Sequence, residues 1–461
     1  MFSLILGVSG LGIISQLLNF QTFAIFIVSV GIPLGFTKYI SESKDDDKHL
    51  TNIIFLNSLR ILTISSVIFA IIISILSKYI SDFLFNDVNF YYFILILALF
   101  IPFSAFSGFL EAYLKGLRDI SLLTKLLISA AVTGTFFTLI FLFLFGLNGA
   151  VIGSLSNSLI STVIYFVVMK KKLLIPKLKI FTRFNREIID NIIKIGFASL
   201  IAGAFAQLIL LLIRTITIDH MGVYGNGIFQ SVLTISLNYF GFIFISLSSY
   251  SFPKVASLKL NSEIVEEINT NFRYIIFLMI PLVAIVFVFR ELVIALLFSR
   301  DFSSAEPLYK FQFFGDLFKA FSWVLGLWLL PKLKIILWLS LDVILYTNFI
   351  LIYICLLKFY SNGLDSLAIS YLLSNFIHFI INLIASRKYI NFRFFPKNLN
   401  AAITGIFILV ILVFISEYKI ILGYISIFPA LLIWFIYAIK KSEWLFIKDN
   451  VKKYVYSKFV S

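Results

Sequence analysis

The sequence has few charged residues and almost no cysteine or histidine. Only 13% of its 461 residues are Asp, Glu, Lys or Arg, and it holds one cysteine and three histidines. Soluble proteins carry about 25% charged residues. Because Cys355 has no second cysteine to pair with, a disulfide framework and a paired-thiolate metal site are both excluded. The histidines at 49, 220 and 378 are far apart and show no metal-ligand spacing, so no metal site is predicted.

Long hydrophobic runs make up most of the chain. The hydrophobic fraction is 61%, and the mean hydropathy is +1.03. A helix that crosses the hydrocarbon core needs roughly 20 mostly apolar residues, and thirteen segments meet this requirement. They lie near residues 11–38, 51–77, 89–113, 122–146, 149–169, 193–216, 227–250, 274–298, 311–330, 334–357, 365–386, 400–416 and 420–439. The sequence therefore predicts an all-α polytopic membrane protein with about 13 transmembrane helices and no sizeable aqueous domain.

Lysine and arginine are concentrated on one side of these segments. The chain has 38 basic and 23 acidic residues, a net charge of +15. If the odd-numbered spans end in the cytoplasm, 29 basic residues fall on that side, 7 on the other and 2 within spans. Since basic residues near span ends orient membrane proteins, we predict a cytoplasmic C-terminus and an outside N-terminus. The positive charge then indicates contact with membrane lipids, not with nucleic acid.

The polar loops are too short for most enzymes of membrane surfaces. The longest outer loops, near residues 78–88 and 299–310, have about a dozen residues, whereas membrane transferases and polymerases present their reactive groups on extended loops. The chain also has no Gly-x-x-x-x-Gly-Lys-Ser/Thr motif, so it does not hydrolyse ATP through a phosphate-binding loop. We predict that the protein is not an enzyme and uses no cofactor.

Two glycine motifs indicate an internal repeat. Gly10-Leu11-Gly12-Ile13 and Gly225-Asn226-Gly227-Ile228 lie about 215 residues apart, and each precedes a long apolar helix. Many transporters consist of two similar halves. The helix at 193–216 has no counterpart before Gly10, so we expect the first helix of a fourteen-helix protein to be missing upstream of Met1. The alternative is a chance match of short glycine and isoleucine stretches.

These patterns divide the chain into five parts. We expect an N-terminal lobe, a basic cytoplasmic linker, a C-terminal lobe, two additional spans and a basic amphipathic tail, at residues 1–172, 173–190, 191–390, 391–440 and 441–461. Linker and tail both combine Lys and Arg with apolar residues, which is typical of segments that lie on an anionic inner leaflet.

Several short stretches, in a consistent order over nearly the whole chain, resemble a known family. They are Leu6-Gly7-Val8-Ser9-Gly10-Leu11-Gly12, Gly31-Ile32-Pro33, Lys115-Gly116-Leu117-Arg118-Asp119-Ile120, Phe145-Gly146-Leu147-Asn148-Gly149, Gly227-Ile228-Phe229-Gln230-Ser231, Phe252-Pro253-Lys254 and Gln312-Phe313-Phe314-Gly315-Asp316. In them the chain is similar to the O-antigen and polysaccharide translocases (flippases) of the multidrug, oligosaccharidyl-lipid and polysaccharide exporter superfamily.

The resemblance implies two lobes around a central cavity in a bacterial inner (plasma) membrane. It further implies that an undecaprenyl-diphosphate-linked oligosaccharide, such as an O-antigen repeat unit, is flipped from the cytoplasmic to the outer leaflet by alternating access. Its functional partners would be the glycosyltransferases and polymerase of surface polysaccharide and lipopolysaccharide assembly. The alternative is a cation-coupled multidrug or metabolite antiporter of the same superfamily, for which an acidic cavity is expected.

Basic residues at membrane depth are the candidates for the diphosphate. Arg60 lies about nine residues into the second span, roughly 14 Å from its cytoplasmic end at 1.5 Å per residue. Its guanidinium offers forked donors suited to phosphate oxygens, and the alternative is a structural pair with a carboxylate. Arg214 and Arg290 lie towards the outer ends of their spans, where they either contact departing substrate or snorkel to the surface.

Two acidic residues are the candidates for a coupling ion. Gln312, Asp316, Lys319 and Trp323 share one face of the ninth span. Asp316 and Lys319 there form either a pair that eases insertion or a substrate and ion site, with Lys319 a further candidate for the diphosphate. Asp342 in the tenth span has mainly apolar neighbours, so it either carries a proton or cation, pairs with a basic group on another helix, or stays protonated.

Overall fold

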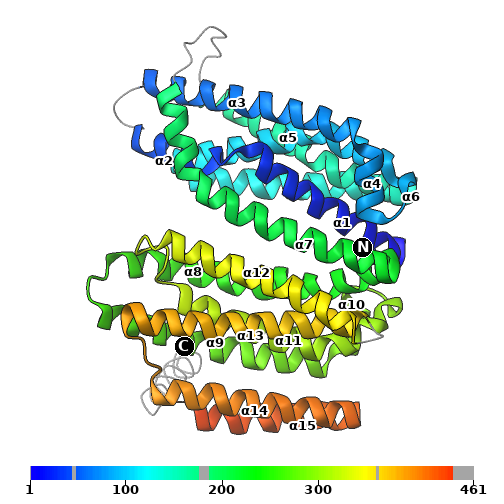
Figure 1. Ribbon diagram of the computed structural model, residues 1–461, viewed down its shortest axis with the longest axis vertical. Helices are drawn as coiled ribbons and strands as arrows, with labels where there is room; N and C mark the ends of the chain where they lie inside the picture. The colour runs from blue at the N-terminus through cyan, green and yellow to red at the C-terminus, as the bar shows by residue number, and fades with distance from the viewer. Residues whose placement is uncertain (1, 44–47, 176–185, 360–362, 440–461) are drawn as a thin grey trace, which may run out of the picture. The chain divides into compact units, whose positions relative to one another are not determined.

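All regular secondary structure described in the computed structural model is helical (Figure 1). The described residues are 2–43, 48–175, 186–359 and 363–439, so most of the predicted linker and the whole predicted tail lie outside them. The α-helices are α1 (Phe2–Ser29), α2 (Ile32–Ser43), α3 (Lys48–Ile75), α4 (Ser77–Phe85), α5 (Tyr91–Gly116), α6 (Ile120–Lys171), α7 (Arg186–Thr234), α8 (Phe240–Ser257), α9 (Asn261–Val288), α10 (Arg290–Leu297), α11 (Glu306–Gly326), α12 (Ile335–Leu357), α13 (Gly363–Ile390), α14 (Pro396–Tyr418) and α15 (Ile420–Ala438). Shorter turns are the 3-10 helices η1 (Val88–Phe90) and η3 (Arg300–Ala305) and the π-helix η2 (Ile235–Tyr239).

The all-α membrane fold predicted from the sequence is confirmed. Within the described residues, ten helical segments are long and apolar enough to cross a membrane. Two of them, Ile120–Lys171 and Ser199–Ser257, have 52 and 59 residues, or roughly 78 and 88 Å at 1.5 Å per residue, more than twice the ~30 Å hydrocarbon core. Each covers two predicted spans; α11, which is not among the ten, covers most of the predicted ninth span and ends at Gly326.

Helix α6 is a hairpin that turns at Gly146. This glycine has φ 56° and ψ −130°, outside the helical region. A β-carbon added at Gly153 would lie 2.7 Å from Thr138 Cα, and one at Gly134 would meet the Asn157 side chain. Residues on either side of the turn therefore pack antiparallel, which agrees with the two separate spans predicted at 122–146 and 149–169.

Some helix ends differ from the prediction. The segment predicted as one span at 11–38 consists of α1 and α2, separated at Gly31 with φ 73°. Helix α9 begins at Asn261, in a region that the charge pattern had indicated as a loop. Hydropathy does not detect the start of α9, because its first turns are polar and hydropathy detects only the apolar part of a helix that extends beyond the membrane.

The described chain forms two compact units. The first consists of Met1–Leu233, Phe298–Ala305 and Ile335–Ser370, and the second of Thr234–Leu297, Glu306–Lys334 and Tyr371–Ser461. The division into lobes at 173–190 stays a prediction.

In the first unit, α5 packs against α1, α2, α3 and α6. An aromatic cluster fills this interface, with Phe36 stacked on Phe109 at 4.5 Å between ring centroids and Phe55 at 5.0 Å from Phe109. Small residues also bring backbones together: a β-carbon at Gly12 would lie 2.0 Å from the carbonyl oxygen of Val223. The glycine motifs of the predicted repeat are therefore in direct contact.

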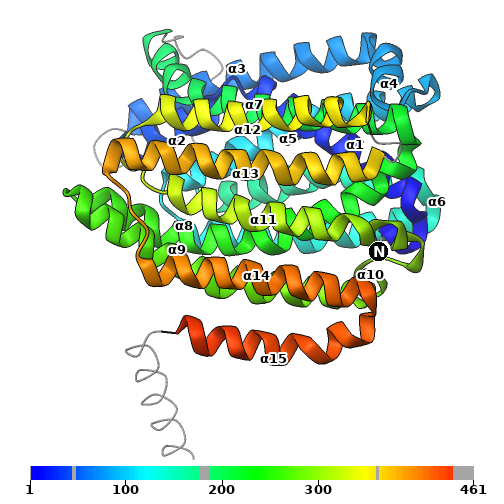
Figure 2. The same ribbon diagram turned by 60° about the horizontal axis from the view of Figure 1, so that its bottom comes forward.

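In the second unit, α9 packs against α11, α14 and α15 (Figure 2). Phe272 of α9 contacts Phe321 of α11 at 4.9 Å between centroids, and Arg273 of α9 donates hydrogen bonds to Asn398 of α14 and the carbonyl of Ala438. The last two helices, predicted as additional spans, thus have polar contacts to α9, the helix that packs against α11.

Candidate functional site

A buried carboxylate in the second unit has a complete set of polar partners. Asp316 of α11 is 1% exposed. Ser236 Oγ donates to Asp316 Oδ2 at 2.5 Å, and the Tyr371 hydroxyl donates to Oδ1 at 2.7 Å. Gln312 Nε2 donates to Ser236 Oγ at 3.1 Å. Three helical segments, η2, α11 and α13, therefore meet at one carboxylate.

Local backbone features place these partners. Ser236 belongs to the π-helix η2, and such one-turn π segments occur frequently at functional sites. A β-carbon at Gly315 would lie 2.6 Å from Tyr371 Cδ1, so only glycine lets the tyrosine ring reach α11. The polar stripe on α11 predicted Asp316 and Gln312, whereas Ser236 and Tyr371 are on other helices and were not found from the sequence.

Lys319 and Trp323 continue the same face of α11. Asp316 and Lys319 interact electrostatically, one helical turn apart, as predicted. Trp323 stacks on Phe244 with 5.2 Å between centroids. Both rings line a cavity of about 380 Å³ that also touches Ser248 and Phe252. A carboxylate, an ammonium group and an aromatic cavity wall thus follow one another along one helix.

Of the remaining predicted residues, Arg290 belongs to the second unit, and Arg60 and Asp342 belong to the first. Arg290, in the same unit, is 3.9 Å from Glu306 Oε2, and its Nη1 donates to the carbonyl of Phe287. Arg60 is half-buried on α3 in the first unit. Asp342 is half-buried on α12, and no hydrogen-bond or ion-pair partner faces it within the described ranges. Asp316 and Lys319 therefore lie together on α11, and Arg290, Arg60 and Asp342 each have a different local environment.

Arg214 is enclosed at the contact between the two glycine motifs. It is 3% exposed, and its Nη1 donates to Ser15 Oγ and Asn226 Oδ1, both at 3.0 Å. Its Nη2 donates to Gln230, and the guanidinium lies 5.6 Å from the Phe229 ring centroid. The side chain does not snorkel: it links α1 to both arms of α7.

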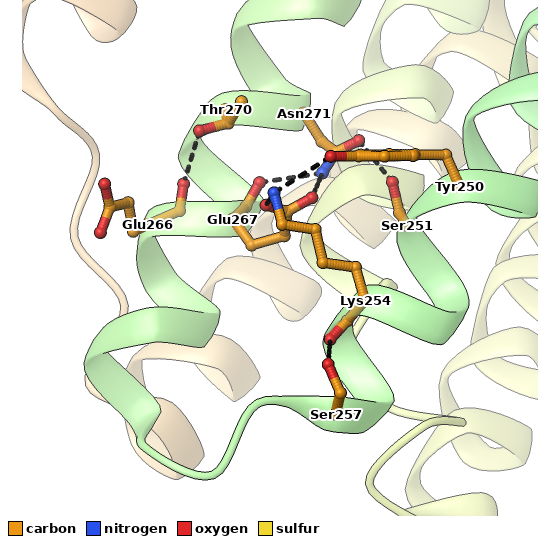
Figure 3. A network of polar contacts seen from close by, with 8 residues as sticks. All are labelled: Tyr250, Ser251, Lys254, Ser257, Glu266, Glu267, Thr270 and Asn271. Carbon is orange, nitrogen blue, oxygen red and sulfur yellow. Dashed lines mark hydrogen bonds and ion pairs between the residues drawn. The ribbon is translucent and has the colours of Figure 1, made fainter.

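A second ionic network joins α8 to α9 (Figure 3). Lys254 Nζ lies 2.5 Å from Oε2 of Glu267, which is 4% exposed. Asn271 Nδ2 donates to Glu267 Oε1 at 3.0 Å, and Ser251 Oγ donates to Asn271 Oδ1 at 2.6 Å. Lys254 also donates to the Tyr250 hydroxyl at 3.2 Å.

The sequence pattern contains only a partial signal for this network. Phe252-Pro253-Lys254 was one of the stretches that carry the family resemblance, but Glu267 lies in the polar start of α9, which was not predicted to be helical. The spacing of Glu267 and Asn271, four residues apart, is the signal that could have revealed a helix face. Among the described residues, no group of three or more His, Cys, Asp or Glu side chains could hold a metal ion.

The sequence is similar to a known family and to two bacterial proteins. Residues 1–259 match the model of the family described as "Polysaccharide biosynthesis protein". The lipid III flippases of Escherichia coli (strain K12) and Shigella flexneri are each 23% identical over 341 residues, which is 74% of this chain and 82% of theirs.

Solved structures show the same fold at low sequence identity. An inward-facing multidrug resistance MATE family transporter of the MOP superfamily has a TM-score of 0.71 at 16% identity, covering 85% of this chain and 92% of its own. An outward-facing MATE family transporter has a TM-score of 0.60 at 15% identity, covering 84% and 88%. The family model matches more than half of the chain, and the chain belongs to the family described as "Polysaccharide biosynthesis protein".

Proposed function

We propose that this transporter flips a polyprenyl-diphosphate-linked oligosaccharide, a repeat unit of a surface polysaccharide such as O-antigen, from the cytoplasmic to the outer leaflet. The observation that carries the proposal is the similarity to the lipid III flippases over 74% of the chain, together with the polysaccharide biosynthesis family match. The membrane is the bacterial inner membrane, with a cytoplasmic C-terminus.

The charges at membrane depth support an anionic cargo. Arg60 in the first unit and Lys319 in the second are cationic residues within helices that cross the membrane, and such groups are costly unless a function retains them. Arg60 supplies a planar fork for two phosphate oxygens, and Lys319 lies next to the aromatic cavity wall at Trp323. Arg214 and Arg290 are further candidates for contacts with the cargo, and protein groups bind both guanidinium groups.

A cation-coupled drug antiporter is the second candidate. The observation that favours it is the buried carboxylate of Asp316, within a fold shared with multidrug transporters. A single acidic residue beside Lys319 is less suited to a cationic drug than an acidic cavity, so we rank this function second. Asp316 and Asp342 serve in either case as candidates for the coupling ion.

Deletion of the gene separates the two functions. A flippase-deficient strain should accumulate lipid-linked repeat units at the inner leaflet and lose its surface polymer, while its sensitivity to cationic drugs stays unchanged. Extraction of lipid-linked oligosaccharides and staining of surface polymer measure the first effect, and drug growth curves measure the second. Increased drug sensitivity with intact polymer would favour the antiporter. The glycosyltransferases and the polymerase of the same polymer are the expected functional partners.

A further inference from the structure

Helix α13 carries a polar side chain at every fourth position. The stripe runs through Ser366, Ser370, Ser374, His378, Asn382 and Ser386. Its serines and Asn382 are at most 3% exposed. Consecutive members of this series, four residues apart, are neighbours on the helix surface, so the stripe winds around α13. Polar groups inside a membrane usually mark a pathway or a bound ion. Of these residue types, only histidine has a side chain that, when unperturbed, binds and releases a proton near neutral pH.

Ser322 of α11 is the hydrogen-bond partner of His378. Its Oγ accepts from Asn382 Nδ2 at 2.9 Å and lies 2.9 Å from His378 Nδ1. When the Ser322 hydroxyl donates to Nδ1, the proton of the neutral ring is on Nε2. In this tautomer Nδ1 is the acceptor and Nε2 the donor.

Two buried atoms on this face then have no protein partner. His378 Nε2, a donor, and Asn375 Oδ1, an acceptor, are both inaccessible and make no hydrogen bond to any described residue. They lie one helical turn apart, and the Asn375 side chain is 97% buried. Buried polar groups rarely stay unsatisfied, and one water molecule that accepts from Nε2 and donates to Asn375 Oδ1 would satisfy both.

The same arrangement suits a charged ring. In an imidazolium ion both nitrogens donate. Ser322 Oγ can accept from Nδ1 once its own proton turns to the backbone carbonyl four residues earlier on α11, and the water on Asn375 accepts from Nε2. Every donor of the protonated ring has an acceptor.

Charged groups on α11 and α13 act on His378 in addition to its burial. Asp316, six residues before Ser322, lies roughly 9 Å away along the helix axis at 1.5 Å per residue, and Lys319 lies between them. On α13 itself, Tyr371 is bound to Asp316, and Arg387 and Lys388 follow two turns beyond His378. The Asp316 carboxylate favours an imidazolium ion and Lys319 opposes it.

We propose that His378 is a proton-binding site of the transport cycle, formed by Ser322, Asn375 and one bound water. Hydronium delivers the proton: Nδ1 forms the new N–H bond, and a water molecule is left behind. The proton leaves from the same nitrogen to water in the opposite state of the cycle. The site does not depend on the identity of the cargo.

Transport at different pH values distinguishes this role from a structural one. The His378→Gln side chain can still bond to Ser322 and to the water, but it cannot bind a proton near neutral pH. We expect normal membrane abundance, reduced surface polymer in a deletion strain, and loss of the pH dependence shown by the wild type. His220→Gln, which alters an exposed histidine, serves as the control and should match the wild type. A wild-type pH profile for His378→Gln would overturn the proposal.

A titration tests the site without cargo. In the His49→Gln/His220→Gln protein, His378 is the sole histidine, and its ring signals can be followed by NMR in detergent between about pH 4 and 8. We expect the signals to titrate, with a higher midpoint in Lys319→Met and a lower one in Asp316→Asn. A ring that does not titrate in this range would contradict proton binding even if the flippase proposal holds. If no polymer depends on the protein, this titration alone still tests the site.

Discussion

Gly12 and Gly227 each lie against the backbone of the other glycine motif, and the two contacts are equivalent. A β-carbon at Gly12 would lie 2.0 Å from the carbonyl oxygen of Val223, and one at Gly227 would lie 2.0 Å from that of Val8. Val8 and Val223 are 215 residues apart, as are Gly12 and Gly227. Gly7 and Gly222, at the same offset, have nearly equal positive φ angles of 64° and 66°. The contact is therefore a local two-fold relationship, and it supports the internal repeat over a chance match.

Alanine at this crossing should destabilise the protein. Gly12→Ala or Gly227→Ala places a methyl group against a carbonyl oxygen, and overpacking of this kind typically costs about 1–3 kcal/mol. The melting temperature of the purified protein and its membrane abundance should both fall. Gly108→Ala is the matched control: a β-carbon there has nothing within 4 Å, so a gain of about 0.5–1 kcal/mol is expected in a helix interior. Equal stability of all three variants would contradict the close backbone contact.

The ion pair between Lys254 and Glu267 should stabilise the contact of α8 with α9. Lys254→Met leaves the Glu267 carboxylate buried with Asn271 as its main partner, at a cost of about 1–3 kcal/mol. The loss is moderate because the Lys254 side chain is 42% exposed. Lys254→Arg should retain most of the stability, since it keeps the charge.

Lys259→Met provides the control for this prediction. Lys259 is exposed, and substitutions at such positions usually change stability by less than about 0.5 kcal/mol. Thermal unfolding followed by tryptophan fluorescence measures all three variants. If Lys254→Met and Lys259→Met unfold at the same temperature, the ion pair contributes nothing.

The two sides of the membrane can be assigned with single cysteines. The free Cys355 is exposed and is first replaced by serine. Leu173, 90% exposed at the end of α6, is predicted to be cytoplasmic, and Tyr79, 78% exposed on α4, to be outside. An impermeant maleimide should label Tyr79→Cys in intact cells and Leu173→Cys only after the membrane is permeabilised. The opposite labelling pattern would reverse the orientation and every cytoplasmic assignment made above.

Sequence patterns predicted what is local in the chain. Hydropathy located the helices because each span must be apolar over its own length, and the pair of Asp316 and Lys319 was visible because residues one turn apart share a helix face. Ser236, Tyr371 and Glu267 were not predicted. Their roles depend on contacts between helices far apart in sequence, which a single sequence does not encode as a pattern. The turn within α6 was predicted from a break in hydropathy, but its glycine geometry was not.

Asp316→Asn should reduce transport more than stability. The amide is close in shape to the carboxylate, yet it cannot bind and release a proton or hold a cation by charge. One of its two donors, Ser236 or Tyr371, would face the amide nitrogen, which costs about 1–3 kcal/mol if it remains unsatisfied. Tyr371→Phe removes one hydrogen bond and leaves the charge, so it should keep most activity.

Surface polymer in a deletion strain, normalised to membrane abundance, measures this difference. Asp301→Asn alters an exposed carboxylate at η3 and should match the wild type. Polymer levels that simply follow abundance in both Asp316→Asn and Tyr371→Phe would indicate that Asp316 is structural.

Arg60 gives the sharpest test of the proposed diphosphate contact. Arg60→Ala should abolish transport while membrane abundance stays near normal, because removing a charge from membrane depth lowers the cost of insertion. Arg60→Lys should retain part of the activity, since an ammonium group keeps the charge but loses the planar fork. If Arg60 is instead half of a structural ion pair, its truncation leaves a carboxylate buried alone at a cost of roughly 3–5 kcal/mol, and abundance would fall together with activity.

Lys78→Ala, on α4 beyond the end of α3, is the basic control and should behave as the wild type. Expression and surface polymer measured together separate the two roles, and full transport by Arg60→Ala would exclude both.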